Sequence, residues 1–189
     1  MEHAQAILCA ALLSGFLLAA CWSDARTRRI PNRLVLAGTL AGLALNALLP
    51  AGAGLFSPAS GGLGFLNALG GFAIGLGALL PLYLLRTMGA GDVKLMAMTG
   101  AFLGPAAIPG AVLMTLLAGG ILALAVAWRH GVVRSALVNV HAMLALTLTG
   151  QRDAMAVPQA VATLPYALAI TAGTWAQLAL ECSGRTLFS

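Results

Sequence analysis

Long uncharged runs, separated by short basic clusters, dominate the pattern of apolar and polar positions along this chain. The first run covers residues 4–22. A helix of that length would be roughly 28 Å long, close to the thickness of a membrane's hydrocarbon core. Further runs cover residues 34–49, 63–85, 93 to about 102 or beyond 105, 108–128 and 161–180. The pattern predicts an all-α bundle of about six membrane-spanning helices, with residues 1–189 forming a single membrane-embedded domain.

The composition agrees with a membrane protein. Hydrophobic residues make up 60% of the chain and charged residues 8%, with a mean hydropathy of +0.96. A soluble domain carries about a quarter charged residues. The three cysteines form no Cys-x-x-Cys pair, so neither a zinc site nor a redox motif is indicated, and we expect no metal or cofactor. The net charge of +5 indicates basic loops beside lipid headgroups, and we expect no nucleic-acid partner.

The positions of the basic residues predict an orientation. Lys and Arg gather at residues 26–33, 86–94 and 129–134. By the positive-inside rule these segments face the cytoplasm, which places the N-terminus outside. The charge-free segment at residues 50–62 then falls outside as well. Residues 132–151 fit either an interfacial amphipathic helix or a seventh span, and we favour the interfacial helix.

Two of the five acidic residues lie at the ends of apolar runs on the same predicted face: Asp24 follows the first run and Asp92 precedes the fourth. Two carboxylates within a few ångströms of each other share one proton. The charged one can activate water while the protonated one polarises a carbonyl, as in aspartic proteases. Gly89 and Gly91 would allow close backbone approach beside Asp92, and Pro31 suits the first turn of the second span.

Each acid could instead have a purely structural role. Asp92 could simply cap the fourth helix, and Asp24 could simply pair with Arg26 or Arg28 in a solvated loop. A proton- or cation-coupled transporter component or a non-catalytic scaffold would also account for acids in a membrane protein. Transporters usually hold such acids near the midplane, whereas these two lie at span ends. Lys94 could tune Asp92 or contact lipid phosphate, and we favour the lipid contact.

Both acids lie in motifs that resemble those of the type IV prepilin peptidases. Residues 24–32, Asp-Ala-Arg-Thr-Arg-Arg-Ile-Pro-Asn, are similar to the family's first motif, an Asp followed by basic residues and Ile-Pro-Asn. Residues 89–95, Gly-Ala-Gly-Asp-Val-Lys-Leu, resemble its second motif, Gly-x-Gly-Asp-x-Lys. Residues 164–170 resemble the Pro-Tyr element of the short members, which serve Flp/tight-adherence pilus systems.

The resemblance implies an aspartic endopeptidase of the bacterial inner membrane, facing the cytoplasm, that removes a basic leader peptide from prepilins or pseudopilins. It implies that Asp24 and Asp92 are the catalytic pair. The residues expected to shape the site or bind substrate are Gly89, Gly91, Lys94, Arg26, Pro31 and Asn32. Larger relatives carry an N-terminal domain with paired Cys motifs and also N-methylate the product, and we expect neither here. The Arg-rich loop should repel a basic leader unless anionic lipid or an acidic pilin residue neutralises it.

Overall fold

The computed structural model describes residues 2–48, 64–85, 87–129, 131 and 166–183. Its regular elements are α1 (Glu2–Thr27), α2 (Asn32–Leu48), α3 (Gly64–Leu84), α4 (Ala90–Arg129) and α6 (Tyr166–Cys182). All of them are helices, which confirms the all-α fold. The predictions for residues 50–62 and 132–151 concern segments outside the described residues.

Three of the described helices, α1, α3 and α4, are long and apolar enough to cross a membrane. The chain is therefore a membrane protein. The count of about six spans and the exterior N-terminus stay predictions, since nothing in the described residues fixes either of them.

The residues fall into two compact units by their internal contacts. The first unit comprises residues 1–118 and 165–189, and the second comprises residues 119–164. Both acids lie in the first unit, together with α1, α2, α3, α6 and the greater part of α4. Of the second unit the structure describes the end of α4 and Gly131, whose backbone is left-handed with φ 68°.

The first helix continues beyond the apolar run that predicted it. α1 ends at Thr27, so Asp24 lies on the helix and not in the loop that the sequence suggested. Arg28 then adopts a left-handed backbone with φ 54°, which stops the helix in the manner of a C-terminal cap. The hydroxyls of Ser23 and Thr27 both donate to the carbonyl of Arg29, at 2.9 and 3.2 Å, and hold the turn in place.

The first part of α4 is the centre of the first unit. Residues 95–103 are buried on every side, although nothing in their sequence is more apolar than in the neighbouring helices. A Cβ on Gly71 of α3 would overlap the backbone of α4 at Gly100, and a Cβ on Gly75 would lie 2.6 Å from the carbonyl oxygen of Met96. The two backbones therefore touch, which only glycine permits because it has no side chain. Such close backbone packing holds helices together in a membrane, where lipid supplies no hydrophobic driving force between them.

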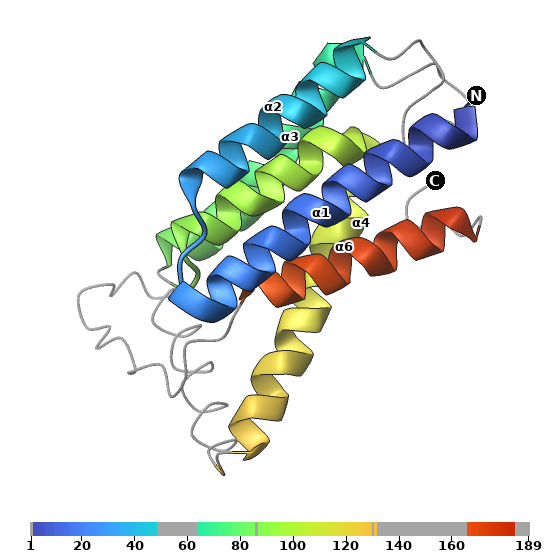
Figure 1. Cartoon of the computed structure of the whole chain (residues 1–189). Helices are drawn as coiled ribbons and strands as arrows, with labels where there is room; N and C mark the ends of the chain where they lie inside the picture. The colour runs from blue at the N-terminus through green and yellow to red at the C-terminus, as the bar shows by residue number, and fades with distance from the viewer. Residues whose placement is uncertain (1, 49–63, 86, 130, 132–165, 184–189) are drawn as a thin grey trace. The chain divides into compact units, whose positions relative to one another are not determined.

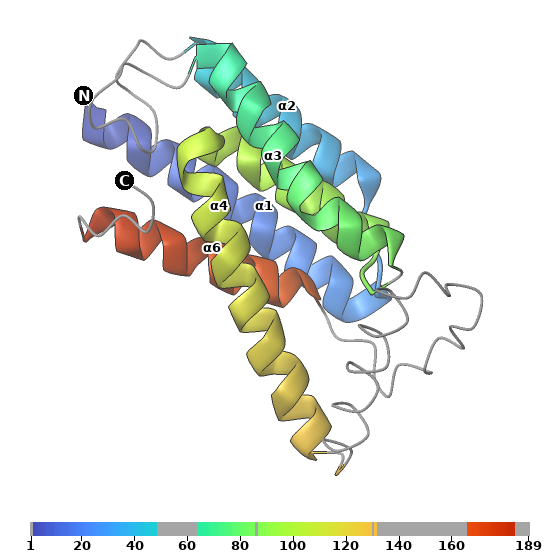
Figure 2. The ribbon, with the colours of Figure 1, turned by 180° about the vertical axis from the view of Figure 1, so that it is seen from behind.

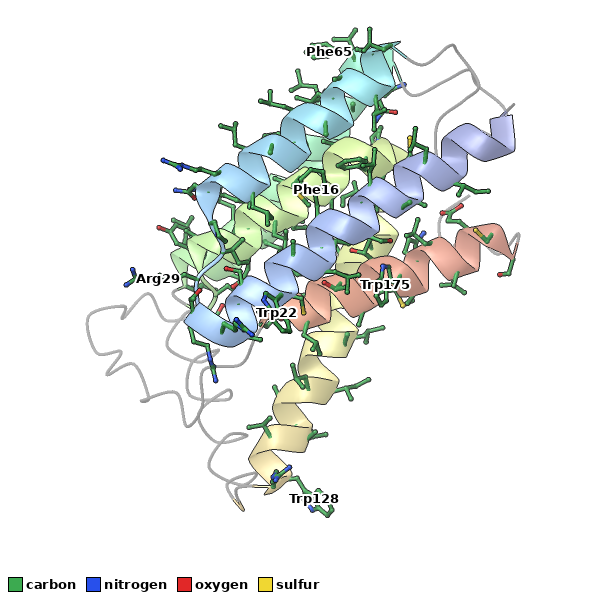
Figure 3. The ribbon with its side chains drawn as sticks, in the orientation of Figure 1. Phe16, Trp22, Arg29, Phe65, Trp128 and Trp175 are labelled. Atoms are coloured by element: carbon green, nitrogen blue, oxygen red, sulfur yellow. The ribbon has the colours of Figure 1, made fainter. Side chains whose placement is uncertain are left out.

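On its other side α4 packs against α2 through large side chains. Met98 and Phe102 of α4 lie over Gly38 and Gly42 of α2, which have no side chain to obstruct them. Phe102 also meets Phe16 of α1, with ring centroids 6.5 Å apart. Figure 3 shows Phe16 within this group of helices. Small residues on α2 and large ones on α4 thus interlock.

α4 is interrupted where the sequence placed the boundary between the fourth and fifth runs. Gly104 has φ 75° and ψ 177°, a conformation that is essentially restricted to glycine, and Pro105 follows it. Figure 2 shows α4 bending sharply between its first part, against α3, and its second part. Forty residues in a straight helix would extend about 60 Å, twice the hydrocarbon thickness, so the bend divides α4 into two arms. The label α4 therefore covers two helices that meet at the kink at Gly104, as the two apolar runs predicted.

A side chain from α2 satisfies a backbone acceptor at this bend. Pro105 has no N–H to donate to the carbonyl of Ala101, one turn earlier. Asn46, which is buried, donates from Nδ2 to that carbonyl at 2.9 Å and to Gly42 of its own helix at 3.0 Å. This explains why Asn46 lies in an otherwise apolar helix, because a buried carbonyl without a hydrogen-bond partner lowers stability.

α6 lies beside α1, although more than 140 residues separate their contacting groups (Figure 1). The Trp175 indole donates to the Ser14 hydroxyl at 3.2 Å. Gly173 receives Thr115 of α4 where a Cβ would not fit. This packing brings the first turn of α6 to the end of α1 that carries Asp24.

Candidate active site

Asp24 is buried at the end of α1 and faces the first turn of α6. Its carboxylate Oδ2 accepts a hydrogen bond from the backbone N–H of Ala167 at 3.4 Å, and only 8% of the residue is exposed. Because the N-terminus of a helix stabilises negative charge, α6 provides a favourable place for this carboxylate. Asp24 is therefore not the acid of a solvated loop, which was the simpler role that the sequence allowed.

Asp92 lies in the first turn of α4 and is half-buried. Its Oδ2 accepts a hydrogen bond from the N–H of Gly89 at 3.2 Å, while its own N–H donates to the Gly89 carbonyl at 3.1 Å. Gly89 is the N-cap of α4, and Asp92 is its third residue, whose carboxylate reaches back to the N-cap N–H as the third residue of a capping box does. Capping occupies one carboxylate oxygen and does not exclude a second role.

The segments that carry the two acids meet, because Ile30, six residues after Asp24, lies against Gly91, the residue before Asp92. Each carboxylate also accepts a backbone N–H from the N-terminus of a different helix, α6 for Asp24 and α4 for Asp92. Two helix N-termini therefore converge on one pair of carboxylates. Such a pair can hold one proton between its members, because two neighbouring negative charges in a partly buried place repel each other.

Two contacts join the segments that contain the acids. A Cβ on Gly91 would lie 3.2 Å from the Cβ of Ile30, so the turn after α1 rests directly on the start of α4. Lys94 donates from Nζ to Oδ1 of Asn32 at 3.1 Å. The close approach that Gly91 permits is thus taken up by the protein's own turn, and Lys94 has an amide partner besides any lipid.

Comparison of the sequence with known protein families identifies the family of this chain. The sequence model of the Type IV leader peptidase family matches residues 11–124, more than half of the chain. The chain belongs to the type IV leader peptidase family. The match includes both motifs and the residues from α1 to α4, and it confirms the resemblance seen in the sequence. Neither the comparison with curated proteins nor that with solved structures gives a match.

Arg26 and Pro31 of this leader peptidase family member are exposed, and their contacts are local. The Arg26 guanidinium lies 4.2 Å from the centre of the Trp22 ring, one turn earlier on α1. Pro31 immediately precedes α2, and its carbonyl accepts the N–H groups of Leu34 and Val35, so it opens the helix as expected. Figure 3 shows Arg29 projecting from the turn after α1, which leaves this turn edged by cations.

A groove of about 500 Å³ lies between α2 and α3 and reaches the start of α4. Its walls are largely apolar. The lining residues are Asn32, Arg33, Val35, Leu36, Thr39, Phe72, Leu76 and Lys94. Neither Asp24 nor Asp92 lines the groove, and Lys94, two residues after Asp92 on α4, projects from a different side of that helix.

The structure adds Tyr166 and Ala167 to the residues predicted from the sequence. Tyr166 begins α6, which is not among the helices long enough to cross a membrane. Burial raises the pKa of the Tyr166 phenol above its ordinary value, and the nearby Asp92 carboxylate raises this pKa further. The Pro-Tyr element of the sequence includes Tyr166, but it does not indicate that the start of α6 contacts Asp24. No group of three or more potential metal ligands occurs among the described residues.

Proposed function

We propose that this chain is a two-aspartate membrane endopeptidase that removes the basic leader peptide from type IV, Flp-like prepilins or pseudopilins. We further propose that it acts at the cytoplasmic face of the bacterial inner membrane, with Asp24 and Asp92 as the catalytic pair. Two observations support the proposal: the chain belongs to the type IV leader peptidase family, and the turn after Asp24 lies against the start of α4, where Ile30 contacts Gly91 beside Asp92.

In the proposed reaction one carboxylate is ionised and the other is protonated. The ionised carboxylate takes a proton from a water molecule as the water oxygen attacks the scissile carbonyl carbon. The protonated carboxylate gives its proton to the carbonyl oxygen, which yields a tetrahedral diol. The C–N bond then breaks, the first carboxyl returns its proton to the leaving amine, and a diol proton restores the second. No bond forms between enzyme and substrate.

The groove beside Lys94 supports the substrate class. A prepilin has a basic leader followed by an apolar helix, and the groove between α2 and α3 has largely apolar walls. An apolar helix bound there would be held against the same group of helices that carries Asp24 and Asp92. Arg33 and Lys94, which also line the groove, would disfavour a basic leader inside it.

The test is co-expression with a candidate pilin precursor, with processing measured as a mobility shift on a gel. Asp24→Asn and Asp92→Asn each keep the side-chain shape and remove the ionisable group. We expect each substitution to abolish detectable processing, since acid–base catalysis contributes about 10²- to 10⁴-fold. The level of inserted protein should stay the same.

Glu181→Gln is the matched control. Glu181 is another carboxylate of the first unit, on the last turn of α6, where it accepts a hydrogen bond from Gln177 at 2.8 Å. Its neutralisation should leave processing intact. Normal processing by both Asp variants would refute the peptidase proposal, and proton-coupled uptake lost in either variant would favour a transporter.

A further inference from the structure

The start of α6 lies at the candidate active site, although α6 is outside the region matched by the family model. The N–H of Ala167 donates to Asp24, and the preceding residue, Tyr166, packs against the buried cluster that includes Val93, the residue after Asp92. One dipeptide therefore contacts Asp24 of α1 and a cluster that includes the residue next to Asp92 on α4. This arrangement indicates that α6 has a role at the candidate active site in addition to packing against α1.

Tyr166 combines a fixed ring with an available hydroxyl. Its ring is half-buried and packs against the core cluster that includes Val93 and Met96 of α4. Within the described residues, the phenol O–H donates to no protein acceptor. A phenol is protonated at neutral pH, so the group remains a hydrogen-bond donor. A donor held in that place is suited to an oxygen atom that belongs to the substrate.

We propose that Tyr166 contacts the substrate and donates a hydrogen bond to the scissile carbonyl oxygen as that oxygen gains negative charge. This inference rests on the proposed peptidase function. Water attack places charge on the carbonyl oxygen, and a fixed neutral donor stabilises the charge without having to reorient. The proton from the acid and the hydrogen bond from Tyr166 would then reach the same oxygen from two sides. α6 thereby supplies a donor to the transition state as well as a backbone contact to Asp24.

Tyr166→Phe tests the proposal, because it retains the packed ring and removes only the O–H group. The chain has two tyrosines, so Tyr83→Phe, on the exposed side of α3, is a matched control. The substrate is a synthetic precursor with a basic leader, a Gly at the cleavage position and an apolar helix, assayed with purified enzyme in detergent. For Tyr166→Phe we expect kcat to fall about 10- to 100-fold, toward the range measured for single oxyanion donors, with KM changed less than about twofold. Tyr83→Phe should match the wild type.

A second measurement separates hydrogen bonding from packing. The ligand is a substrate-like peptide in which a secondary alcohol replaces the scissile amide, and its matched control carries a methylene at that position. The alcohol oxygen takes the place of the attacked carbonyl oxygen, so Tyr166→Phe should weaken inhibition by the alcohol peptide several-fold and leave inhibition by the methylene peptide unchanged. Wild-type kcat in Tyr166→Phe, or an equal loss of inhibition by both peptides, would overturn the role of Tyr166 and leave the peptidase function standing. Failure of the wild type to cleave would instead overturn the proposed function and this inference with it.

Discussion

The contact between α3 and α4 makes a quantitative prediction for two glycines of the same helix. A Cβ added at Gly75 would lie 2.6 Å from the Met96 carbonyl oxygen, whereas one added at Gly77 meets nothing within 4 Å. Ordinary contact begins at 3.4 Å, so Gly75→Ala requires α3 and α4 to separate by about 0.8 Å. Overpacking of this kind costs about 1–3 kcal/mol, since neither backbone can move aside alone.

Comparison of the two variants isolates this steric cost. Each substitution also gains roughly 0.5–1 kcal/mol, because alanine loses less conformational freedom than glycine when a helix forms. That gain is common to both variants, so the difference between them reports the packing alone. We therefore expect Gly75→Ala to be about 1–3 kcal/mol less stable than Gly77→Ala. Cleavage by Gly75→Ala should also fall, since Met96 is one turn from Asp92.

The assay is thermal unfolding in detergent, followed with a thiol-reactive fluorophore. Cys9 is buried, with 3% of its surface exposed, and becomes reactive as the helices separate. Cys182 is exposed and Cys21 is partly exposed, so both could react before unfolding, and the measurements are made in a Cys21→Ser, Cys182→Ser background. A Gly75→Ala protein that melts at or above the temperature of Gly77→Ala would refute the close contact of the two backbones.

Two other substitutions test single hydrogen bonds. Asn46→Leu should lower stability in the same assay by about 1–3 kcal/mol, because the carbonyl of Ala101 then stays unpaired in the core; unchanged stability would contradict this. Asn32→Ala should reduce the cleavage rate by roughly two- to fivefold with little effect on melting, since its bond to Lys94 is exposed. Lys94→Ala should act through the same bond, so the double variant should lose no more than either single one, and additive losses would count against this pairing.

The helices and their limits were largely accessible to sequence reasoning. Charge and glycine bound the third run at residues 63–85, and α3 covers Gly64–Leu84. The break near Gly104 was predicted as well, because glycine and proline together interrupt a helix. The sequence analysis did not predict that α1 continues through Asp24. Hydropathy indicates where a helix leaves the apolar region, and the helix can continue beyond that point.

Which helices are neighbours was not accessible from the sequence. Apolar residues surround every helix here, so no amphipathic face indicates a partner. The contact of Asp24 with Ala167 joins positions 143 residues apart, and no local pattern encodes it. For the same reason the two motifs predicted the acids of the candidate site but not Tyr166, whose significance depends on where α6 packs.

The backbone contact between α3 and α4 also restricts how a peptide in the lipid can reach the acids. A helix with its side chains is about 10 Å across, and no such width exists where Gly71 touches Gly100. That side of the molecule is closed to lateral diffusion of a membrane-embedded protein unless the two helices part. An incoming chain must approach from a different flank, so crosslinkers placed along α2 should capture it more readily than crosslinkers placed at the junction of α3 with α4.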